Sequence, residues 1–292
     1  MPIDTTTRRE AAVAAALGKL SNLAMLPEIA IRVIRLAEDP NVTMTQMADV
    51  ISTSPELCVR ILRVVNSAFY GLPGEVRTIQ LATTLMGLES VKNVTIAASL
   101  TRLFHGRPLS PRFSPRDLWT HSLAVAAATR LVAVRTRSGV VEEAFLAGMV
   151  HDVGLIAELQ LDRQKLATVL ARMEDDESAD LLAVEESIYG ATHQDFGAGL
   201  LRAWKLPHIF SLAAGWHHRP FELPVSERTL PVMVHVGDRL VATCTPGLHL
   251  DDASTEISEQ ALDYLRLTRP QMDDVLASLP QAIDEIKSAL GS

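Results

Sequence analysis

The spacing of apolar residues along the chain follows the period of an α-helix. In the segment PELCVRILRVVNSAFYG, residues 55–71, apolar side chains recur on one helical face. The members of that face are Leu57, Ile61, Val64, Val65, Ala68 and Phe69. Gly71 then supplies a left-handed cap, and no segment shows the sustained alternation of a half-buried strand. The pattern predicts an almost entirely helical protein.

Residues that start helices recur between these apolar segments. The usual signal is a side-chain oxygen that accepts from free backbone N–H groups, followed by proline or by a capping-box partner. It occurs at Thr43 with Gln46, Ser54 with Pro55, Ser114 with Pro115 and Asp117, and, as proline alone, at Pro207. Gly87 predicts a tight corner between two helices.

Three polar segments interrupt the helices. Residues 105–115, HGRPLSPRFSP, are rich in proline, glycine and basic side chains and form the best linker, which divides the chain into two helical halves. Residues 174–177, EDDE, predict a solvated loop, and residues 245–256, TPGLHLDDASTE, a third break. Two amphipathic helices are expected after that break.

The composition is that of an ordinary globular protein. Hydrophobic residues make up 48% of the 292 and charged residues 21%, so a folded chain is expected. Aromatic residues are few, at 4%, while Ala and Leu are many, which favours packed helices over sheets. The formal net charge of −8 disfavours a general binder of nucleic acids or of anionic membranes.

The cysteines and the N-terminal segment indicate a compartment. Cys58 and Cys244 are too few for a disulfide framework or a zinc-type cluster, and their apolar surroundings predict buried thiols. Charges interrupt every apolar run short of a membrane span. Asp4 and Glu10 favour an amphipathic first helix over a signal peptide. These features predict a cytoplasmic protein.

A histidine and an aspartate follow one of the most apolar runs. In MVHDVGLIAEL, residues 149–159, His151 and Asp152 come directly after the uncharged, mostly apolar run Ala144 to Val150. Burying a carboxylate costs several kcal/mol unless it is paired or bound to metal. Either the pair is exposed, or neighbouring groups compensate it.

Histidines are concentrated in the middle of the chain. Six of the nine lie between His121 and His218, and each alone is more often a core or surface residue than a ligand. As a set, imidazoles and carboxylates from five predicted helices or helix ends could converge inside a bundle and bind Fe, Mn or Zn. The candidate ligands are His121, His151, Asp152, His193, His217, His218 and Asp238. We assign the remaining histidines to the core or the surface: His105, His208, His235 and His249.

The order of these residues resembles a known superfamily. From Phe113 to about Ala242 the chain is similar to the HD superfamily of metal-dependent phosphohydrolases, whose pattern is a His, a His-Asp doublet and a distant Asp. This pattern maps onto His121, His151-Asp152 and Asp238, and His193 with His217-His218 resembles the longer ligand set of the HD-GYP subgroup. The resemblance implies one or two divalent ions at these residues.

The N-terminal half resembles the HDOD family more closely, over about residues 20 to 245. The matching segments are LPEIAIRVIRLAEDP, VISTSPELCVRILRVVNSAFYG, IQLATTLMGLESVKN and GATHQDFGAGLLRAWKLP, and NSAFYG is the most diagnostic. The family implies an all-α, two-lobed bundle with the HDOD lobe packed on an HD-like domain. The expected units are an N-terminal helix at 1–19, the HDOD lobe at 20–105, the metal-binding lobe at 113–245 and C-terminal helices at 255–292.

The chain departs from the phosphohydrolase pattern on the substrate side. HD phosphohydrolases often carry Lys after the His-Asp-x-Gly turn, where this chain has Leu155, and HHRPFELP replaces the GYP element. Arg219 and Arg239 are the candidate phosphate-binding residues. The metal-ligand pattern is therefore nearly complete, while the pattern that handles substrate is damaged.

These observations favour a bacterial regulatory module that binds a protein partner in a signalling pathway and keeps a metal site. The alternative is a metal-dependent phosphohydrolase or phosphodiesterase acting on nucleotides or cyclic dinucleotides, and a nucleotide ligand is compatible with both. A third interpretation, DNA binding through the corner at Gly87, has little support, because Lys92 is the one strong cation from Leu81 to Leu100.

The NSAFYG segment carries a structural expectation of its own. We expect Asn66 to cap or bridge backbone groups near the helix end, and Phe69 to be a core side chain. The competing interpretation is a partner-binding patch.

Overall fold

The structure, a computed structural model, describes residues 5–20, 26–111, 113–176, 178–244 and 256–290. Within these residues the chain forms helices and a single isolated β-bridge between Ser110 and Phe113, and no strand. The all-helical prediction is therefore confirmed. The histidine at position 249 and most of the third polar break lie outside the described residues.

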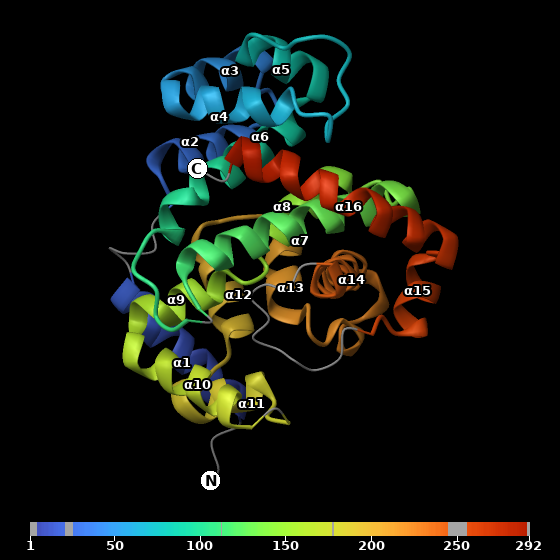
Figure 1. Cartoon of the computed structure of the whole chain (residues 1–292). Coiled ribbons are helices and arrows are strands. Elements are labelled where there is room, and N and C mark those ends of the chain that lie inside the picture. The colour runs from blue at the N-terminus through green and yellow to red at the C-terminus, as the bar shows by residue number, and fades with distance from the viewer. Residues whose placement is uncertain (1–4, 21–25, 112, 177, 245–255, 291–292) are drawn as a thin grey trace.

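The first helices, with the exception of α1, stack at one end of the molecule. They are α1 (Thr5–Leu20), α2 (Glu28–Ala37), α3 (Met44–Ser52), α4 (Pro55–Val65), α5 (Ile79–Met86), α6 (Leu88–Leu100) and η1 (Thr101–Phe104). Figure 1 shows α3, α4 and α5 at the top with α2 and α6 beneath them, while α1 lies at the opposite end of the molecule. Helix α6 is buried from Ser90 to Leu100 and packs on α2, α4, α5 and α8, so it joins the upper helices to the remainder of the core.

The remaining helices surround a long central helix, α7. They are α7 (Pro115–Thr136), α8 (Val141–Val150), α9 (Val153–Leu161), α10 (Arg163–Asp175), α11 (Leu181–Tyr189), α12 (His193–Ala203), α13 (His208–Trp216), η2 (Pro220–Glu222), η3 (Val225–Glu227), α14 (Thr229–Cys244), α15 (Glu259–Leu265) and α16 (Arg269–Leu290). Helix α7 packs against α8, α14 and α16, which explains why most of its side chains are buried.

The C-terminal helix α16 connects the two predicted halves of the chain. It packs on both α4 and α7, and it crosses above α7 and α8 in Figure 1. The indole N–H of Trp119 on α7 donates to the backbone carbonyl of Leu290 at 3.3 Å. The division of the chain into the four predicted units stays a prediction.

The predicted helix starts agree with the structure. Thr43 and Gln46 form a complete capping box, and the side chains of Ser54 and Ser114 accept from backbone N–H groups of α4 and α7. Gly87 is the corner between α5 and α6, with φ of 82°, a conformation that side-chain-bearing residues rarely adopt.

Helix α4 ends earlier than its apolar face predicts. Its last residue is Val65, so Ala68 is exposed instead of lying on the buried face. The Asn66 side chain fixes this end, because its Nδ2 donates to the carbonyls of Leu62 at 2.8 Å and Val76 at 2.7 Å. Its Oδ1 accepts from the Val76 N–H at 2.7 Å. The expected bridging role of Asn66 is confirmed.

Phe69 is half-buried, so the expectation of a fully buried core side chain was too strong. The Arg130 guanidinium of α7 lies 4.6 Å from the centre of the Phe69 ring and 4.5 Å from that of Tyr70. Its Nη1 also donates to the Phe69 carbonyl at 3.0 Å, and Phe145 of α8 packs on the other side. The Arg130 side chain therefore occupies a place beside Phe69 that apolar side chains would fill in a fully buried core. Together, Phe69, Tyr70, Arg130 and Phe145 attach the end of α4 to α7 and α8.

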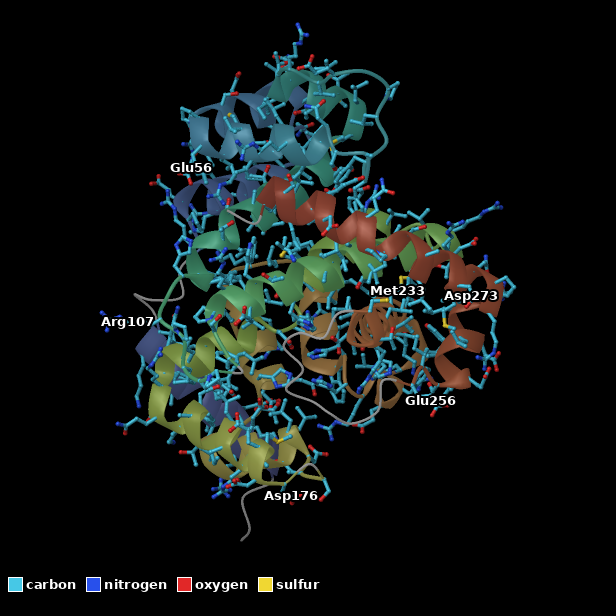
Figure 2. All side chains as sticks on the ribbon, viewed as in Figure 1. Glu56, Arg107, Asp176, Met233, Glu256 and Asp273 are labelled. Carbon is cyan, nitrogen blue, oxygen red and sulfur yellow. The ribbon has the colours of Figure 1, made fainter. Side chains whose placement is uncertain are left out.

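Charged side chains point outward around the molecule. Figure 2 shows Glu56, Arg107 and Asp176 at its edge, while Met233 of α14 lies inside and is 1% exposed. One stretch, Val141–Leu161, is long and apolar enough to cross a membrane, but 78% of it is buried inside the protein, as in an ordinary core helix.

Replacing Asn66 by Ala is expected to destabilise the protein by about 1–3 kcal/mol, because the buried Val76 N–H and C=O lose their partners. Chemical denaturation of both proteins measures the difference. Asn41→Ala is the matched control, since that exposed side chain bridges no buried backbone groups. An equal effect of the two substitutions would show that Asn66 has no bridging role.

Candidate metal centre

The structure brings the seven sequence-predicted side chains together in the middle of the bundle. His121 comes from α7, His151 and Asp152 from the junction of α8 and α9, and Asp238 from α14. His193 opens α12, and His217 and His218 directly follow α13. One ligand atom from each residue lies within 4.8 Å of the others in two groups. The groups are Asp152 with His193, His217 and His218, and His121 with His151 and Asp238.

The Asp152 carboxylate lies between the two groups. Its Oδ2 is 3.2 Å from Nε2 of His151 and 3.7 Å from Nε2 of His121. Its Oδ1 is 3.4 Å from Nε2 of His217 and 3.7 Å from Nε2 of His193. Each carboxylate oxygen therefore faces a different set of imidazoles. This carboxylate is positioned to bridge two ions.

The backbone fixes which ring nitrogen carries the proton. Nδ1 of His151 lies 2.8 Å from the carbonyl of Gly148, and Nδ1 of His217 lies 3.0 Å from that of Ala214. A carbonyl oxygen only accepts, so each Nδ1 is the donor and each Nε2 of the neutral ring keeps a lone pair. Nε2 of both rings faces Asp152. Burial alone would lower the pKa of His151, but the Asp152 carboxylate outweighs it and raises that pKa, so His151 pairs with Asp152 as a donor, whereas neutral His217 keeps its Nε2 lone pair.

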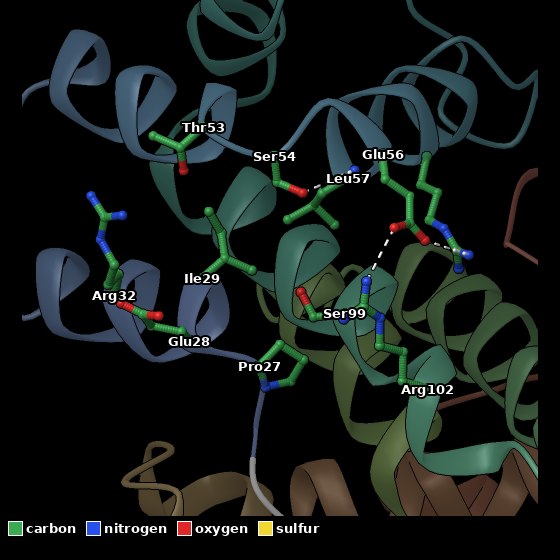
Figure 3. A pocket seen from close by; sticks show the side chains of 11 residues that line it. Pro27, Glu28, Ile29, Arg32, Thr53, Ser54, Glu56, Leu57, Ser99 and Arg102 are labelled. Carbon is green, nitrogen blue, oxygen red and sulfur yellow. Dashed lines mark hydrogen bonds and ion pairs between the residues drawn. The ribbon is translucent and has the colours of Figure 1, made fainter.

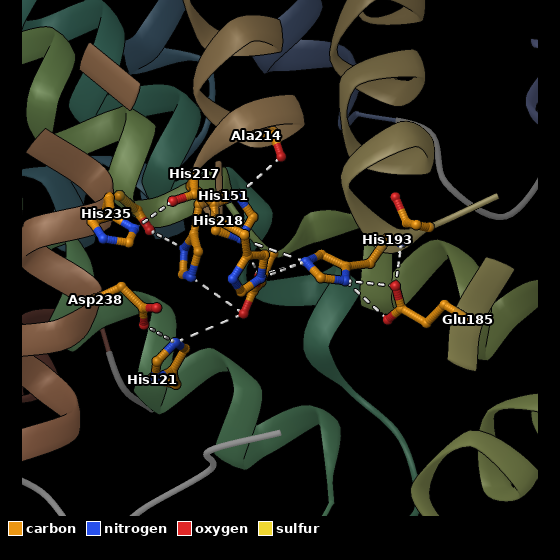
Figure 4. Close-up of polar contacts among 12 residues, drawn as sticks. His121, His151, Glu185, His193, Ala214, His217, His218, His235 and Asp238 are labelled. Atoms are coloured by element: carbon orange, nitrogen blue, oxygen red, sulfur yellow. Dashed lines mark hydrogen bonds and ion pairs between the residues drawn. The ribbon is translucent and has the colours of Figure 1, made fainter. Parts of the chain in front are cut away.

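His193 is oriented in the same way by Glu185 of α11. The Glu185 carboxylate accepts from the backbone N–H of His193 and from its Nδ1, both at 2.9 Å. Nε2 of His193 then faces Nε2 of His218 at 3.1 Å and Nε2 of His217 at 3.5 Å. Figure 4 shows the His193 ring between Glu185 on one side and these two imidazoles on the other.

Glu185 is the main residue of the site that the sequence interpretation missed. It is completely buried, although it lies in the polar-looking sequence VEESIY and is followed by Glu186, which pairs with Arg9 at the surface. The sequence signal that could have identified Glu185 as a partner of His193 was its position eight residues earlier, on the preceding helix. A carboxylate that orients a ligating histidine is a recurrent partner in metal sites.

Burial and mutual charge set the protonation of the site. Burial, with a contribution from His218, lowers the pKa of His217 to about 3, so this imidazole is neutral. Burial alone would raise the pKa of Asp152, but His151 and the other imidazoles outweigh it and hold that pKa well below its usual value. His121 likewise lowers the pKa of Asp238 against the effect of burial.

These donors fit divalent metal. Ligand atoms that each bind an ion at about 2.1 Å lie roughly 3.0–3.4 Å apart, and several of the distances above fall in that range. A cation between the facing lone pairs would remove their repulsion. The chemistry of the set, imidazoles and carboxylates without thiolates, suits Fe, Mn or Zn. The role of the seven residues as ligands stays a prediction.

Gly154 allows the two halves of the site to approach. A Cβ at this position would lie 1.8 Å from the backbone carbonyl oxygen of His193, so helices α9 and α12 are in direct backbone contact. Gly197 belongs to the same contact, where its backbone nitrogen would lie 2.9 Å from that Cβ. This contact keeps Asp152, at the start of α9, within reach of His193.

The residues proposed to handle phosphate are placed less favourably. Leu155 is buried and 2% exposed, so it offers neither charge nor access. Arg219 is exposed and lies 3.9 Å from Glu222, while Arg239 is half-buried beside Asp238 on α14. Phosphate binding by these two arginines stays a prediction.

A separate pocket of about 300 Å³ lies between α2, α4 and α6 (Figure 3). Two of its three arginines are already engaged, because Arg60 and Arg102 each donate to Glu56 at 3.2 Å and Arg60 also donates to Thr101. The third, Arg32, forms neither an ion pair nor a hydrogen bond within the described residues. The hydroxyl of Ser99 donates to a backbone carbonyl of its own helix.

Comparison with protein families identifies the class. The HDOD domain model matches residues 23–220, and the chain belongs to the HDOD family. The matched residues include the whole metal centre except Asp238.

Solved structures share this fold. An HDOD domain protein of unknown function from Geobacter sulfurreducens has a TM-score of 0.75 at 21% identity, covering 96% of this chain and 98% of its own. A provisionally assigned phosphohydrolase from Shewanella amazonensis has a TM-score of 0.75 at 23% identity, with 95% and 98% covered. A provisionally assigned signal transduction protein from Marinobacter aquaeolei has a TM-score of 0.76 at 21% identity, with 99% and 66% covered.

A curated relative is longer than this chain. An uncharacterised protein from Treponema pallidum is 21% identical over 214 residues, which are 73% of this chain and 40% of that protein. The match therefore spans less than half the length of that protein.

Glu158 on α9 gives the site a testable pH dependence. It is completely buried, and neither carboxylate oxygen has a hydrogen-bond partner in the described part of the chain. Burial first, and then the charges of Glu185 and Asp152, raise its pKa well above the usual value. The folded protein therefore holds a proton that the unfolded chain releases above about pH 4.5.

Because the folded state keeps this proton, the free energy of unfolding falls as the pH rises above about 4.5, by up to about 1.4 kcal/mol per pH unit. Glu158→Gln removes this dependence, so the stability of the variant relative to the wild type increases as the pH rises above about 4.5. Urea denaturation of chelator-treated protein at several pH values measures it. A constant difference between the two proteins across that range would contradict the raised pKa.

Proposed function

We propose that this protein is a regulatory module of the HDOD type that keeps an HD-like metal centre and acts mainly by binding. The observation that carries the proposal is the convergence of imidazole Nε2 atoms on both oxygens of Asp152. Several imidazole nitrogens and an ionised carboxylate gathered in one place form a ligand set for a divalent ion, which would take the place of any proton held between them.

The residues expected beside a bound substrate favour binding over turnover. A lysine next to the metals could hold a phosphate, but Leu155 packs into the core at that position. The loop after His218 reads RPFELP and begins with a short 3₁₀ helix, η2. Catalysis requires the transition state to be held more tightly than the ground state, and Leu155 and the RPFELP loop replace two elements that would hold the phosphate there.

A metal-dependent phosphohydrolase is the second candidate, and the bridging position of Asp152 favours it. Two bound ions would lower the pKa of a coordinated water and polarise a phosphoryl oxygen. The residues of this chain would hold the ions, orient His193 through Glu185 and exclude bulk water by burial. A structural neighbour provisionally assigned as a metal-dependent phosphohydrolase, from Shewanella amazonensis, has a TM-score of 0.64.

The signalling role includes a protein partner in the cytoplasm. The structural neighbour provisionally assigned as a signal transduction protein supports this part of the proposal. DNA binding at the Gly87 corner is not proposed, because Lys92 is buried and paired with Glu89.

Metal content tests the centre directly. Protein purified without chelator is expected to carry up to two equivalents of Fe, Mn or Zn by elemental analysis, and Asp152→Ala to lose most of it. Glu185→Gln is expected to retain the ions with about 10–100-fold lower affinity, because His193 loses its charged orienting partner. His105→Ala, a histidine outside the centre, is the control. Equal metal in the wild type and Asp152→Ala would refute the assignment.

Turnover distinguishes the two candidate functions. Metal-loaded protein is expected to hydrolyse cyclic di-GMP, nucleotides and a generic phosphodiester no faster than Asp152→Ala does. Hydrolysis that is fast in the wild type and absent in Asp152→Ala would replace the regulatory proposal by the phosphohydrolase. Activity gained by Leu155→Lys alone would identify the missing cation as the limiting part.

A further inference from the structure

A groove of about 820 Å³ lies between α1, α12 and α13. Its walls include Arg9 and Val13 of α1, Arg202 of α12, and Trp216 with Arg219 at the end of α13. None of the seven metal-centre side chains lines it, so it is a separate site. Its volume is in the range of small-molecule sites.

Helix α1 forms one wall of this groove, and it lies before the residues matched by the HDOD model. It packs on α12, and both lie in the lower part of Figure 1. Gly199 makes this packing close, since a Cβ there would lie 2.5 Å from Cγ1 of Val13. Arg9 and Glu186 add a two-pronged ion pair with distances of 3.0 and 2.6 Å. The wall is thus held by apolar packing and by charge.

The charges around the groove favour an anion. Arg202 is exposed, and within the described residues its guanidinium forms neither an ion pair nor a hydrogen bond. Arg219 is exposed as well, with only a long contact to Glu222 at 3.9 Å. Of the two carboxylates that line the groove, Asp195 is occupied by the capping box of α12, and Glu10 of α1 is exposed to solvent, which screens its charge. Two arginines are therefore available for a phosphate.

Two further side chains suit a flat, hydrogen-bonding ring. Gln194 is 2% exposed, and its Nε2 is buried without a hydrogen-bond partner in the described structure. An unmet buried donor costs free energy, which a ligand acceptor or a turn of the amide towards a ligand would recover. Trp216 is half-exposed, whereas Trp119 and Trp204 are buried, so it has an aromatic surface available for stacking.

We propose that this groove binds a mononucleotide. The base stacks on Trp216, the Gln194 amide hydrogen-bonds to it, and the phosphate pairs with Arg202 and Arg219. Because α12 and α13 also present His193, His217 and His218, the nucleotide occupies the outer side of the helices that hold one half of the metal centre.

Binding is measured by isothermal titration calorimetry and by the fluorescence of Trp216. The full-length protein is titrated with AMP, GMP, adenosine and inorganic phosphate, once after chelator treatment and once metal-loaded. We expect AMP or GMP to bind at least ten-fold more tightly than adenosine or phosphate alone, and to do so in the chelated protein. Because the groove lies apart from the metal centre, failure of the metal assignment leaves this result unchanged.

Point variants locate the bound nucleotide. Arg202→Gln and Arg219→Gln are each expected to weaken binding at least ten-fold, and Trp216→Phe to abolish the fluorescence change. Gln194→Leu separates binding from folding, since it should lower nucleotide affinity without lowering the melting temperature. Arg102→Gln, in the pocket between α2 and α4, is the control and should bind as the wild type. Nucleotides that bind no tighter than phosphate, or equally to all variants, would overturn the proposal.

Discussion

Asp152 is a carboxylate whose two oxygens face the Nε2 atoms of four imidazoles. The carbonyls of Gly148 and Ala214 and the carboxylate of Glu185 each accept a hydrogen bond from an Nδ1, so three of these rings turn Nε2 inward. Such an arrangement is unfavourable for a chain on its own and favourable around a cation. The helix ends that carry these side chains must therefore be held in place by packing, and the surrounding bundle supplies that packing.

The bundle positions the site through a few contacts between distant segments. Helix α8 packs along α7, and its last turn delivers His151 and Asp152. Arg130 of α7 lies over the rings of both Phe69 and Tyr70 and pairs with Glu142 in the first turn of α8, which attaches the segment after α4 to α7 and α8. The diagnostic NSAFYG segment is thus a joint between helices, where half-buried aromatic rings and an arginine replace a purely apolar core.

Local physical rules made the helices and their caps predictable from the sequence, while the seven convergent side chains were predicted as a set through the resemblance to the HD superfamily. Capping oxygens and the 3.6-residue period act over a few residues, so the chain displays them directly. Glu185 was missed because its importance comes from a neighbour one helix away, and Glu158 because its burial depends on tertiary packing. The early end of α4 was missed for a related reason, since Asn66 bonds to Val76 across a turn. The groove at α1 depends on how two helices pack and leaves no linear signature.

Gly154 shows that the centre has a requirement beyond its donor atoms. The helix backbones of α9 and α12 touch at this residue, and the space there is smaller than a methyl group. A related chain could therefore preserve all seven histidines and aspartates and still have lost the ability to hold two ions, through the gain of one carbon atom. Counting the chains that keep the ligand residues would therefore overestimate the number of metal-binding members of such a family. The glycine, which is not itself a ligand, indicates whether the two halves of the site can still lie close together.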